Sequence, residues 1–420
     1  MLKAFKYRIY PESEQIVLLE KHFGCTRSVY NLGLSAKQLA YSGNKVSVSY
    51  SKLNEQLNDL KEGFPFFKEV NSQSLQSSLR NLDTAFEKFF KYGAGFPKFK
   101  SKRGKQSFQC PQHVSVEDKM LWLPKFKSGV PIVLHRPFKG KIKTVTISKT
   151  PTEKYFASIL VENEEEKLPI KPIPEKEYAI GIDVGLKSFA TIGNIDLTRS
   201  FKIENPKYLV RSEKILARRQ KQFSKKIKGS NNREKSRLTL SRLHEKIFNQ
   251  RKDFTNKISF RLVNDSQVNT ICIEDLNVRG MMSNHKLARA IGDVGWNELF
   301  SQLKYKSDWN GKNLLLAERF SATSKDCHKC GHKNNSLTLA IREWDCPICR
   351  THHDRDENSV PNIITSAFVR YDKNKNRDGL PESTLGESLP LSSRKTPKRK
   401  ARTKNQEKFR DDSVIQFSAS

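Results

Sequence analysis

The sequence predicts a multidomain α+β protein, in which a β-barrel split by a helical insertion precedes an α/β domain with a cysteine-rich insertion. Three observations lead to this prediction. Strand-like and helix-like hydrophobic patterns succeed one another over the first 170 residues, a buried strand with a single acid follows a charged linker, and two CxxC pairs lie near the C-terminal end. The 420 residues are enough for two or three hydrophobic cores.

The first 170 residues predict the split barrel. Residues 3–10, KAFKYRIY, alternate between apolar and basic positions, which predicts a half-buried strand with one basic face. Helical patterns follow over residues 11–93, and strand patterns return between residues 94 and 170. We therefore expect a barrel built from residues 1–10 and 94–170, interrupted by a helical domain.

The charge of the chain predicts a polyanionic partner. Its 77 Lys and Arg against 45 Asp and Glu leave a net charge of +32, which favours nucleic acid over the alternative of a merely soluble basic surface. No apolar run approaches the roughly 20 residues that span a bilayer, and the N-terminal MLKAFKYRIYPE does not resemble a secretory signal. We expect no membrane partner and a cytoplasmic, nucleoid-associated location.

Two basic segments are candidates for nucleic-acid contact. GFPKFKSKRGKQSFQC (95–110) interleaves phenylalanines with Lys and Arg, which suits phosphates and stacked bases, although a strand with snorkelling lysines is the alternative. Residues 211–261 carry 17 Lys and Arg against 4 Asp and Glu and show one apolar helical seam. The candidate contacts are Lys6, Arg8, Arg27, Lys98, Lys100, Lys102, Arg103, Lys225, Lys226, Lys228 and Arg251.

Two further segments mark boundaries. A charged, proline-bearing stretch ends in residues 171–177, which we interpret as the linker to the second half of the chain. Residues 372–420 are rich in Pro, Ser, Lys and Arg, so we expect a disordered basic tail. Its cluster RKTPKRKAR (394–402) is a candidate for nonspecific contact with anionic polymers.

Four cysteines predict a structural zinc site. CHKC and CPIC, separated by 15 residues, contribute Cys327, Cys330, Cys346 and Cys349. Two such turns complete a tetrahedron of thiolates around Zn²⁺ and leave no position open for catalysis. Gly331 suits the tight turn of a zinc ribbon, which we place at residues 322–352. Redox dithiols are the alternative, but no thioredoxin-like pattern surrounds either pair; nearby His332, His352 and His353 are interpreted as surface or supporting residues.

Three acids predict a second metal site. Asp183 is the lone acid of the apolar strand in YAIGIDVG, and a buried carboxylate is costly unless something compensates its charge. Glu274 closes the strand in NTICIEDL, and Asp356 precedes a helical pattern. A ribonuclease-H-like fold brings such positions together, where two Mg²⁺ ions can promote phosphodiester hydrolysis. An actin-like ATPase fold and simple turn-capping acids are the alternatives.

Several motifs together resemble one family. KAFKYRIYP, GIDVGLKSFAT, IEDLNVRGM, SKDCHKCG and DRDENSVPNI follow one another in this order. With these motifs the chain resembles the TnpB family of transposon-encoded proteins, which is related to the compact type V CRISPR effectors. The similarity extends over nearly everything before residue 370.

The resemblance implies an RNA-guided DNA endonuclease that serves its transposon. Its RuvC-like nuclease domain would comprise residues 178–321 and 353–371, with Asp183, Glu274 and Asp356 as the magnesium-binding catalytic triad. Asp354 and Asp275 are the fallback choices. The split barrel would be the wedge and residues 11–93 the recognition module. The implied partners are a guide RNA encoded by the same element and double-stranded target DNA beside a short motif.

One departure from the family pattern bears on activity. Members of the family often show DxNAAxNI after the last acid, whereas this chain has DENSVPNI, with Ser359 and Val360 in place of the small pair. Pro361 is expected in the first helical turn, where proline is tolerated. Two alternatives remain at this point: a nuclease-inactive, RNA-guided DNA-binding repressor, and a DNA transposase that works without RNA.

Overall fold

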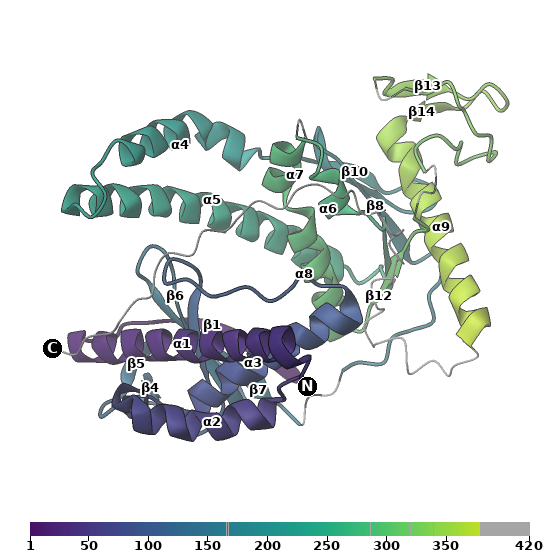
Figure 1. Ribbon diagram of the computed structural model, residues 1–420. Coiled ribbons are helices and arrows are strands. Elements are labelled where there is room, and N and C mark those ends of the chain that lie inside the picture. The colour runs from purple at the N-terminus through teal and green to yellow at the C-terminus, as the bar shows by residue number, and fades with distance from the viewer. Residues whose placement is uncertain are drawn as a thin grey trace.

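The computed structural model describes residues 1–378, except residues 165, 167, 286, 320, 322 and 339. Two sheets, each with its own helices, form the body of the molecule, and a small hairpin projects from one end (Figure 1). Within the described ranges, no helix combines the length and the apolar character that crossing a membrane requires.

The first sheet has seven antiparallel strands. They are β1 (Leu2–Ile9), β2 (Gln106–Cys110), β3 (Ser115–Glu117), β4 (Met120–Trp122), β5 (Val130–Val133), β6 (Lys141–Lys149) and β7 (Tyr155–Glu162), in the order β2-β6-β7-β1-β5-β4-β3. The first strand of the chain therefore lies between β5 and β7. The edge strands β2 and β3 do not pair with each other in the described chain, so the split barrel that we expected is present as a curled half-barrel.

The alternation predicted for β1 is observed. Tyr7 and Ile9 are buried in the sheet core, whereas Ala4 and Lys6 are exposed on the opposite face. The polar face of β1, which carries Ala4 and Lys6, therefore points toward the second half of the molecule.

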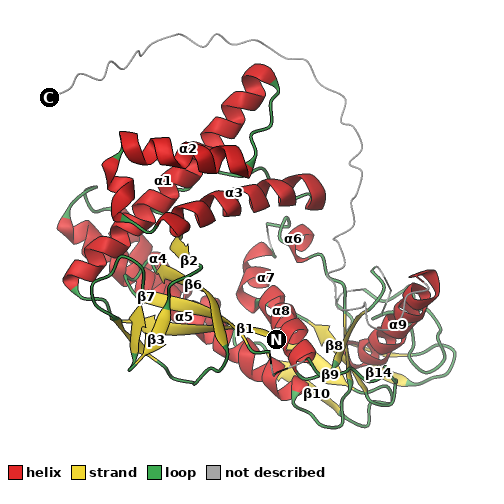
Figure 2. Cartoon of the chain, turned by 90° about the horizontal axis from the view of Figure 1, so that it is seen from below, coloured by secondary structure: helices red, strands yellow, loops and turns green. Residues whose placement is uncertain are grey.

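A helical unit is inserted between β1 and β2. It contains α1 (Ser13–Asn44), α2 (Tyr50–Gly63), the short 3₁₀ helix η1 (Pro65–Glu69) and α3 (Ser72–Tyr92). The helices pack around a core of their own that includes Leu34, Leu53 and Leu75. Figure 2 shows α1, α2 and α3 gathered together beside the sheet.

The second sheet has five strands of mixed direction. They are β8 (Ala179–Val184), β9 (Ser188–Gly193), β10 (Ser200–Glu204), β11 (Thr270–Ile273) and β12 (Asn313–Leu316), in the order β10-β9-β8-β11-β12. β8, β9 and β10 are antiparallel neighbours, whereas β8, β11 and β12 run parallel. The strands on either side of Gly185 are β8 and β9, which pair with each other across this tight turn.

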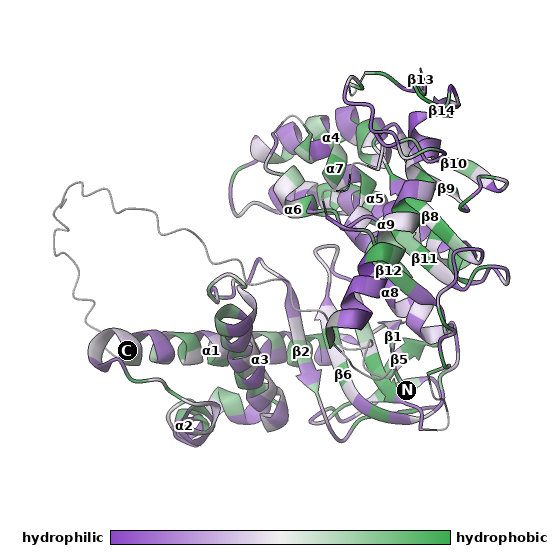
Figure 3. Ribbon diagram, turned by 90° about the vertical axis from the view of Figure 1, so that its right-hand side faces the viewer, coloured by the Kyte–Doolittle hydropathy of each residue, from purple (hydrophilic) through white to green (hydrophobic). Residues whose placement is uncertain are grey.

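Helices cover both faces of this second sheet. On one face lie α5 (Asn231–Val263), α7 (Ala288–Val294) and α8 (Trp296–Trp309), and α4 (Tyr208–Ser224) packs along α5. A four-residue helix, α6 (Val278–Met281), follows β11. On the opposite face, α9 (Arg355–Asp378) crosses the hydrophobic strands β8, β11 and β12, as Figure 3 shows.

Close packing of α9 depends on one glycine of the central strand. A Cβ atom at Gly181 in β8 would lie 2.6 Å from the carbonyl oxygen of Val360 in α9. Such a contact is shorter than real Cβ atoms tolerate. Glycine at this position therefore sets the distance between the helix and the sheet.

The hairpin of β13 (Glu343–Asp345) and β14 (His352–Asp354) runs directly into α9. The expected boundary between ribbon and nuclease, at residues 352 and 353, thus falls inside β14. Residues 372–378, which we assigned to the tail, continue α9, and residues 379–420 with the cluster 394–402 lie outside the described chain.

The expected place of Pro361 was wrong. Asp354 caps the helix by accepting hydrogen bonds from the backbone N–H groups of Asp356 and Glu357, so α9 begins at Arg355. Pro361 therefore lies inside the helix rather than in its first turn. There it withholds the N–H that would otherwise bond to the carbonyl group of Glu357.

Candidate functional site

Two acids lie side by side at the ends of parallel strands. Ile182 of β8 is paired with Ile273 of β11, so the next residues along the two strands are Asp183 and Glu274. Asp183 faces α9, where the hydroxyl group of Ser359 donates a 2.6 Å hydrogen bond to its Oδ2 atom. The hydroxyl group of Thr323 donates a 2.9 Å bond to Glu274 Oε1.

Both carboxyl groups resist ionisation. Burial and the charge of Glu274 raise the pKa of Asp183 to about 8, against the opposing effect of the Ser359 hydrogen bond. Burial likewise raises the pKa of Glu274, while the Thr323 hydrogen bond opposes the shift. Two neighbouring acids of this kind repel each other when ionised, and a divalent cation would remove that repulsion.

The third predicted acid comes to the same site from α9. Asp356 lies in the first turn of the helix, and its charge also raises the pKa of Asp183. Its Oδ1 atom accepts a 3.3 Å contact from Arg342. The charges of Glu274 and Asp356 thus both act on Asp183, so the acids from β8, the end of β11 and the start of α9 lie near one another.

The fallback acids have other partners. Asp354 caps α9 and forms an ion pair of 2.6 Å with Lys202. Asp275 forms ion pairs with Arg319 and Arg370, at 3.3 and 3.2 Å. Both fallback acids are therefore paired with basic side chains, as Asp356 is with Arg342.

In the part of the chain that is described, one group of at least three potential ligands has its ligand atoms within 4.8 Å of one another, and it consists of cysteines. The carboxylate oxygens of Asp183, Glu274 and Asp356 are therefore not all within this distance of one another, as a site for a single ion would require. Two magnesium ions about 4 Å apart need a wider spread of carboxylates than one ion does. Asp183, Glu274 and Asp356 come to the site from three places, namely β8, the residue after β11 and the first turn of α9.

The four predicted cysteines converge. The Sγ atoms of Cys327 and Cys349 lie 3.6 Å apart, as do those of Cys330 and Cys346. Tetrahedral Zn²⁺ with bonds of about 2.3 Å requires sulfur atoms about 3.8 Å apart, so the cluster has the size of a zinc site. The buried His353 places its Nε2 atom 3.1 Å from Cys327 Sγ, where an N–H group would support a thiolate.

Both CxxC turns have the same backbone geometry. Gly331 donates its N–H to the carbonyl group of Cys327, with φ at +75°, as expected for the tight turn. Arg350 makes the corresponding bond to Cys346 with φ at +57°. The second turn therefore holds a non-glycine residue in the left-handed region that favours glycine.

Two asparagines of α9 connect the cysteine-bearing segment to this helix, and the sequence analysis did not identify them. Asn358 accepts a hydrogen bond from the backbone N–H of His328 and donates to the carbonyl group of Asp326. Asn362, one helical turn later, donates to the carbonyl groups of Asp326 and Thr323. Their spacing of four residues in a predicted helix was the available signal, but nothing indicated their partners.

Some predicted nucleic-acid contacts already have partners. Arg27 donates to Gln106, Lys100 lies 3.9 Å from the ring centroid of Tyr30, and Arg251 donates to the carbonyl group of Gly292. Arg8 lies between the rings of Tyr10 and Phe156. These four side chains therefore have structural roles whether or not nucleic acid is bound.

Other candidates present exposed cationic ends. Lys225, Lys226 and Lys228 lie in the turn between α4 and α5, and within the described residues their ammonium groups have no acidic partner. In the stretch before β2, the candidates Lys98, Lys102 and Arg103 are likewise exposed and have no acidic partner within the described residues. Lys6 is exposed on the polar face of β1, with its ammonium group 4.4 Å from the ring centroid of Phe156.

Three family models match successive parts of the chain. Residues 1–45 match a helix-turn-helix domain of the OrfB_IS605 type, and residues 158–285 match OrfB_IS605, described as "Probable transposase". Residues 296–363, which contain the cysteines and Asp356, match the Cas12f1-like TNB domain. Together these matches include β1, the whole second sheet and the cysteine cluster, whereas β2 to β6 of the first sheet lie outside them.

Relatives match over almost the whole chain. A protein of Streptomyces pristinaespiralis, named "Putative RNA-guided DNA endonuclease", is 39% identical over 87% of this chain and 90% of its own length. InsQ of Escherichia coli K12, which carries the same description, is 29% identical over 88% of this chain and 93% of its own.

The fold also resembles a solved structure. The Cas12f1 chain in a complex with sgRNA and target DNA superimposes with a TM-score of 0.55, at 14% identity, over 87% of this chain and 98% of that one. At this level of identity the likeness concerns the fold alone.

Proposed function

The chain belongs to the TnpB family, and from this premise we propose that it is an RNA-guided, Mg²⁺-dependent DNA endonuclease with one RuvC-like active site. The observation that carries the proposal is the juxtaposition of Asp183 and Glu274 on parallel strands, with Asp356 on the crossing helix. The strand order of the second sheet supports a ribonuclease-H-like domain. The names of the relatives support RNA guidance and DNA cutting.

The catalytic roles follow from the chemistry of the acids. When ionised, Asp183, Glu274 and Asp356 would hold magnesium ions, which supply an activated water and charge stabilisation at the phosphodiester. Ser359 orients Asp183, and Thr323 orients Glu274, through the hydrogen bonds described above. Zn²⁺ held by the four cysteines would be structural and keep the ribbon in place on α9.

The remaining parts of the proposal concern the partners. The guide RNA would be encoded by the protein's own element and pair with one strand of a target duplex beside a short motif. The assigned parts are the wedge (1–10 and 94–170), the recognition module (11–93), the linker (171–177), the nuclease (178–321 and 353–371) and the target-binding ribbon (322–352). The basic helices α4 and α5 are candidates to grip the backbone of the nucleic acid.

Replacement of the acids tests this proposal. We expect Asp183→Asn and Glu274→Gln each to lower the cutting rate at least 1,000-fold, which is the order of loss when transition-state stabilisation by a bound metal is removed. The amount of RNA that copurifies should stay unchanged, because neither acid is among the candidate nucleic-acid contacts. Cleavage of a matched duplex and sequencing of the copurified RNA are the two measurements.

The neighbouring acid provides a matched control. Asp275→Asn makes the same charge change one residue away, at a carboxylate paired with two arginines, and should keep cutting within about threefold. Cutting at the wild-type rate in both Asp183→Asn and Glu274→Gln would refute the site. Copurified RNA without cutting by the wild-type protein would favour the repressor, and cutting without RNA would favour a transposase.

A further inference from the structure

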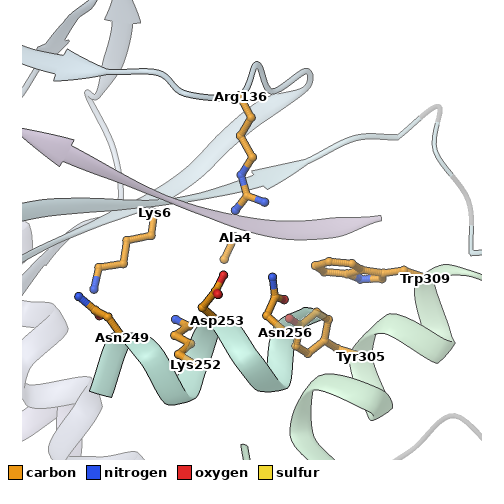
Figure 4. A pocket seen from close by; sticks show the side chains of 9 residues that line it. All are labelled: Ala4, Lys6, Arg136, Asn249, Lys252, Asp253, Asn256, Tyr305 and Trp309. Carbon is orange, nitrogen blue, oxygen red and sulfur yellow. The ribbon is translucent and has the colours of Figure 1, made fainter. Parts of the chain in front are cut away.

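An open cavity of about 620 Å³ lies between the two halves of the molecule. Figure 4 shows β1 on one side and helices α5 and α8 on the other. The residues that line it are Ala4, Lys6, Arg136, Asn249, Lys252, Asp253, Asn256, Tyr305 and Trp309. The exposed face of β1 and one face of α5, at positions 249, 252, 253 and 256, therefore converge on the same space.

The cavity carries unneutralised positive charge. Lys6, Arg136 and Lys252 come from three separate segments, and none of them forms an ion pair within the described residues. The single acid in the lining, Asp253, is already paired with Lys257 at 2.7 Å. Burial and the nearby charge of Lys252 lower the pKa of Lys6, while Glu245, which would raise it, pairs with Lys154. A bound anion would relieve this repulsion.

The other side of the cavity is suited to a nucleobase. The ring centroids of Tyr305 and Trp309 lie 4.7 Å apart at 59°, and Lys3 Nζ lies 5.5 Å from the Trp309 centroid. Trp309 is half-buried, so the part of its ring that these neighbours leave uncovered can stack on a base. Asn249 and Asn256 of α5 contribute side-chain amide groups to the lining. Lys306 donates a hydrogen bond to the side-chain oxygen of Asn256, which leaves the Asn256 NH₂ group for a ligand. The volume is within the range of small-molecule sites.

We propose that this cavity binds one unstacked nucleotide of the protein's RNA, with its phosphate at Lys6, Arg136 and Lys252 and its base on Trp309. This inference rests on the proposed function for the presence of RNA. Lys6, Arg136 and Lys252 supply cations for a phosphate, and Trp309 with the amide groups of α5 supplies a surface for a base, so the lining matches the two chemically different ends of a nucleotide. An acidic peptide would satisfy the cations but would leave the stacking surface unused.

Two variants and two matched controls test the pocket. The full-length protein, stripped of nucleic acid, is titrated with a single-stranded RNA carrying 4-thiouridine. We expect Lys252→Gln and Trp309→Ala each to raise the Kd about tenfold. Lys304→Gln removes the same charge from the exposed side of α8, and Trp309→Phe keeps a ring; both should stay within about twofold. Thermal unfolding shows whether Trp309→Ala keeps its fold.

Photocrosslinking locates the nucleotide. A crosslink from 4-thiouridine to Tyr305 or Trp309, identified by mass spectrometry and lost on competition with unlabelled RNA, is the expected result. Equal Kd values for Lys252→Gln and Lys304→Gln, or crosslinks confined to other segments, would overturn the proposal, as would tighter binding of the matched DNA strand. These readouts do not require cutting. Failure of the proposed function would instead appear as a wild-type protein that copurifies without RNA.

Discussion

The hydroxyl group of Ser359 connects α9 to Asp183 of the candidate active site through a hydrogen bond. It lies 2.6 Å from Asp183 Oδ2 and 2.7 Å from the carbonyl oxygen of Asp356. One hydroxyl proton cannot serve both acceptors at once. Ionisation of Asp183 strengthens the bond to its carboxylate, so Ser359 favours the charged form that would hold a cation.

This contact predicts a pH effect for Ser359→Ala. A proton competes with Mg²⁺ for Asp183 below its raised pKa of about 8, so cutting at limiting Mg²⁺ should increase as pH rises toward that value. Loss of a hydrogen bond to the charged form, worth about 1.5 kcal/mol, should move this increase upward by about one pH unit. Cutting rates between pH 6 and 9.5 at low and saturating Mg²⁺ measure the shift.

A second serine of the same helix is the matched control. Ser366 accepts a hydrogen bond from the Glu318 backbone and lies away from the acids, so Ser366→Ala should keep the wild-type pH profile. A Ser359→Ala profile identical to wild type would show that the hydroxyl bonds to Asp356 instead. In the cation-free protein, the same raised pKa makes ionisation destabilising, so the free energy of unfolding should fall as pH rises from the ordinary carboxyl pKa of 3.8 to about 8 and should level off above that.

The sequence indicated the candidate side chains more readily than the residues that support them. Asp183 could be identified because a lone acid in an apolar strand needs compensation, and the cysteines because their spacing is rare outside metal sites. The roles of Asn358 and Asn362 could not be predicted, since their amide groups bond to carbonyl groups 32 to 39 residues away. Such partners become apparent only when the chain is folded.

At the scale of elements, α9 joins the three parts of the candidate site. Its first turn carries Asp356, its next residues bind the ribbon and Asp183, and its apolar face packs on β8 and β11. The hydrophobic pattern predicted this helix, but Pro361 suggested a later start. The cap that fixes the true start is Asp354, a residue we had considered as a metal ligand.

The approach of α9 to the sheet can be tested with Gly181→Ala. The new Cβ atom would overlap with the Val360 carbonyl group, and we expect a loss of about 2 kcal/mol in the free energy of unfolding. Gly24→Ala, in the middle of α1 with open space around it, should instead be neutral or stabilise by up to about 1 kcal/mol. Denaturant titration measures both, and equal stability of the two variants would contradict tight packing.

The ribbon gives a prediction about metal removal. Cys346→Ser removes one of four thiolates, so zinc content, measured by mass spectrometry, should fall from one ion per chain to well below half. Cutting should fall at least tenfold, because the ribbon binds the first turns of α9 through Asn358.

Cys25→Ser provides the control, since this buried cysteine lies in the helical unit, away from the cluster. It should keep its zinc. A full complement of zinc in Cys346→Ser would show that the cluster is not the metal site.

At the scale of the whole molecule, charge was predictable but cavity shape was not. The net charge of +32 requires only composition, whereas the basic segment 211–261 directs attention to the exposed lysines between α4 and α5. The cavity beside Lys6, by contrast, depends on how β1 faces α5, two elements more than 200 residues apart. The half-barrel likewise depends on which strands lie at its edges, β2 and β3, and no local sequence pattern indicates this.

The exposed lysines predict a salt effect on RNA binding. The triple variant Lys225→Gln, Lys226→Gln, Lys228→Gln loses three cations that have no acidic partner among the described residues. If each contacts one phosphate, the slope of log Kd against log salt should fall by about 2, since single strands release about 0.7 counterion per neutralised phosphate. Filter binding between 50 and 300 mM salt measures this slope.

A control of equal charge separates local contact from overall attraction. Lys91, Lys143 and Lys171 are paired with Glu87, Glu162 and Asp308, so their ammonium groups are already engaged by protein carboxylates. Their replacement by glutamine lowers the net charge by the same three units but should leave the slope nearly unchanged. If both triple variants lose the same slope, the RNA responds to the total charge of the molecule, and the turn between α4 and α5 is not a contact.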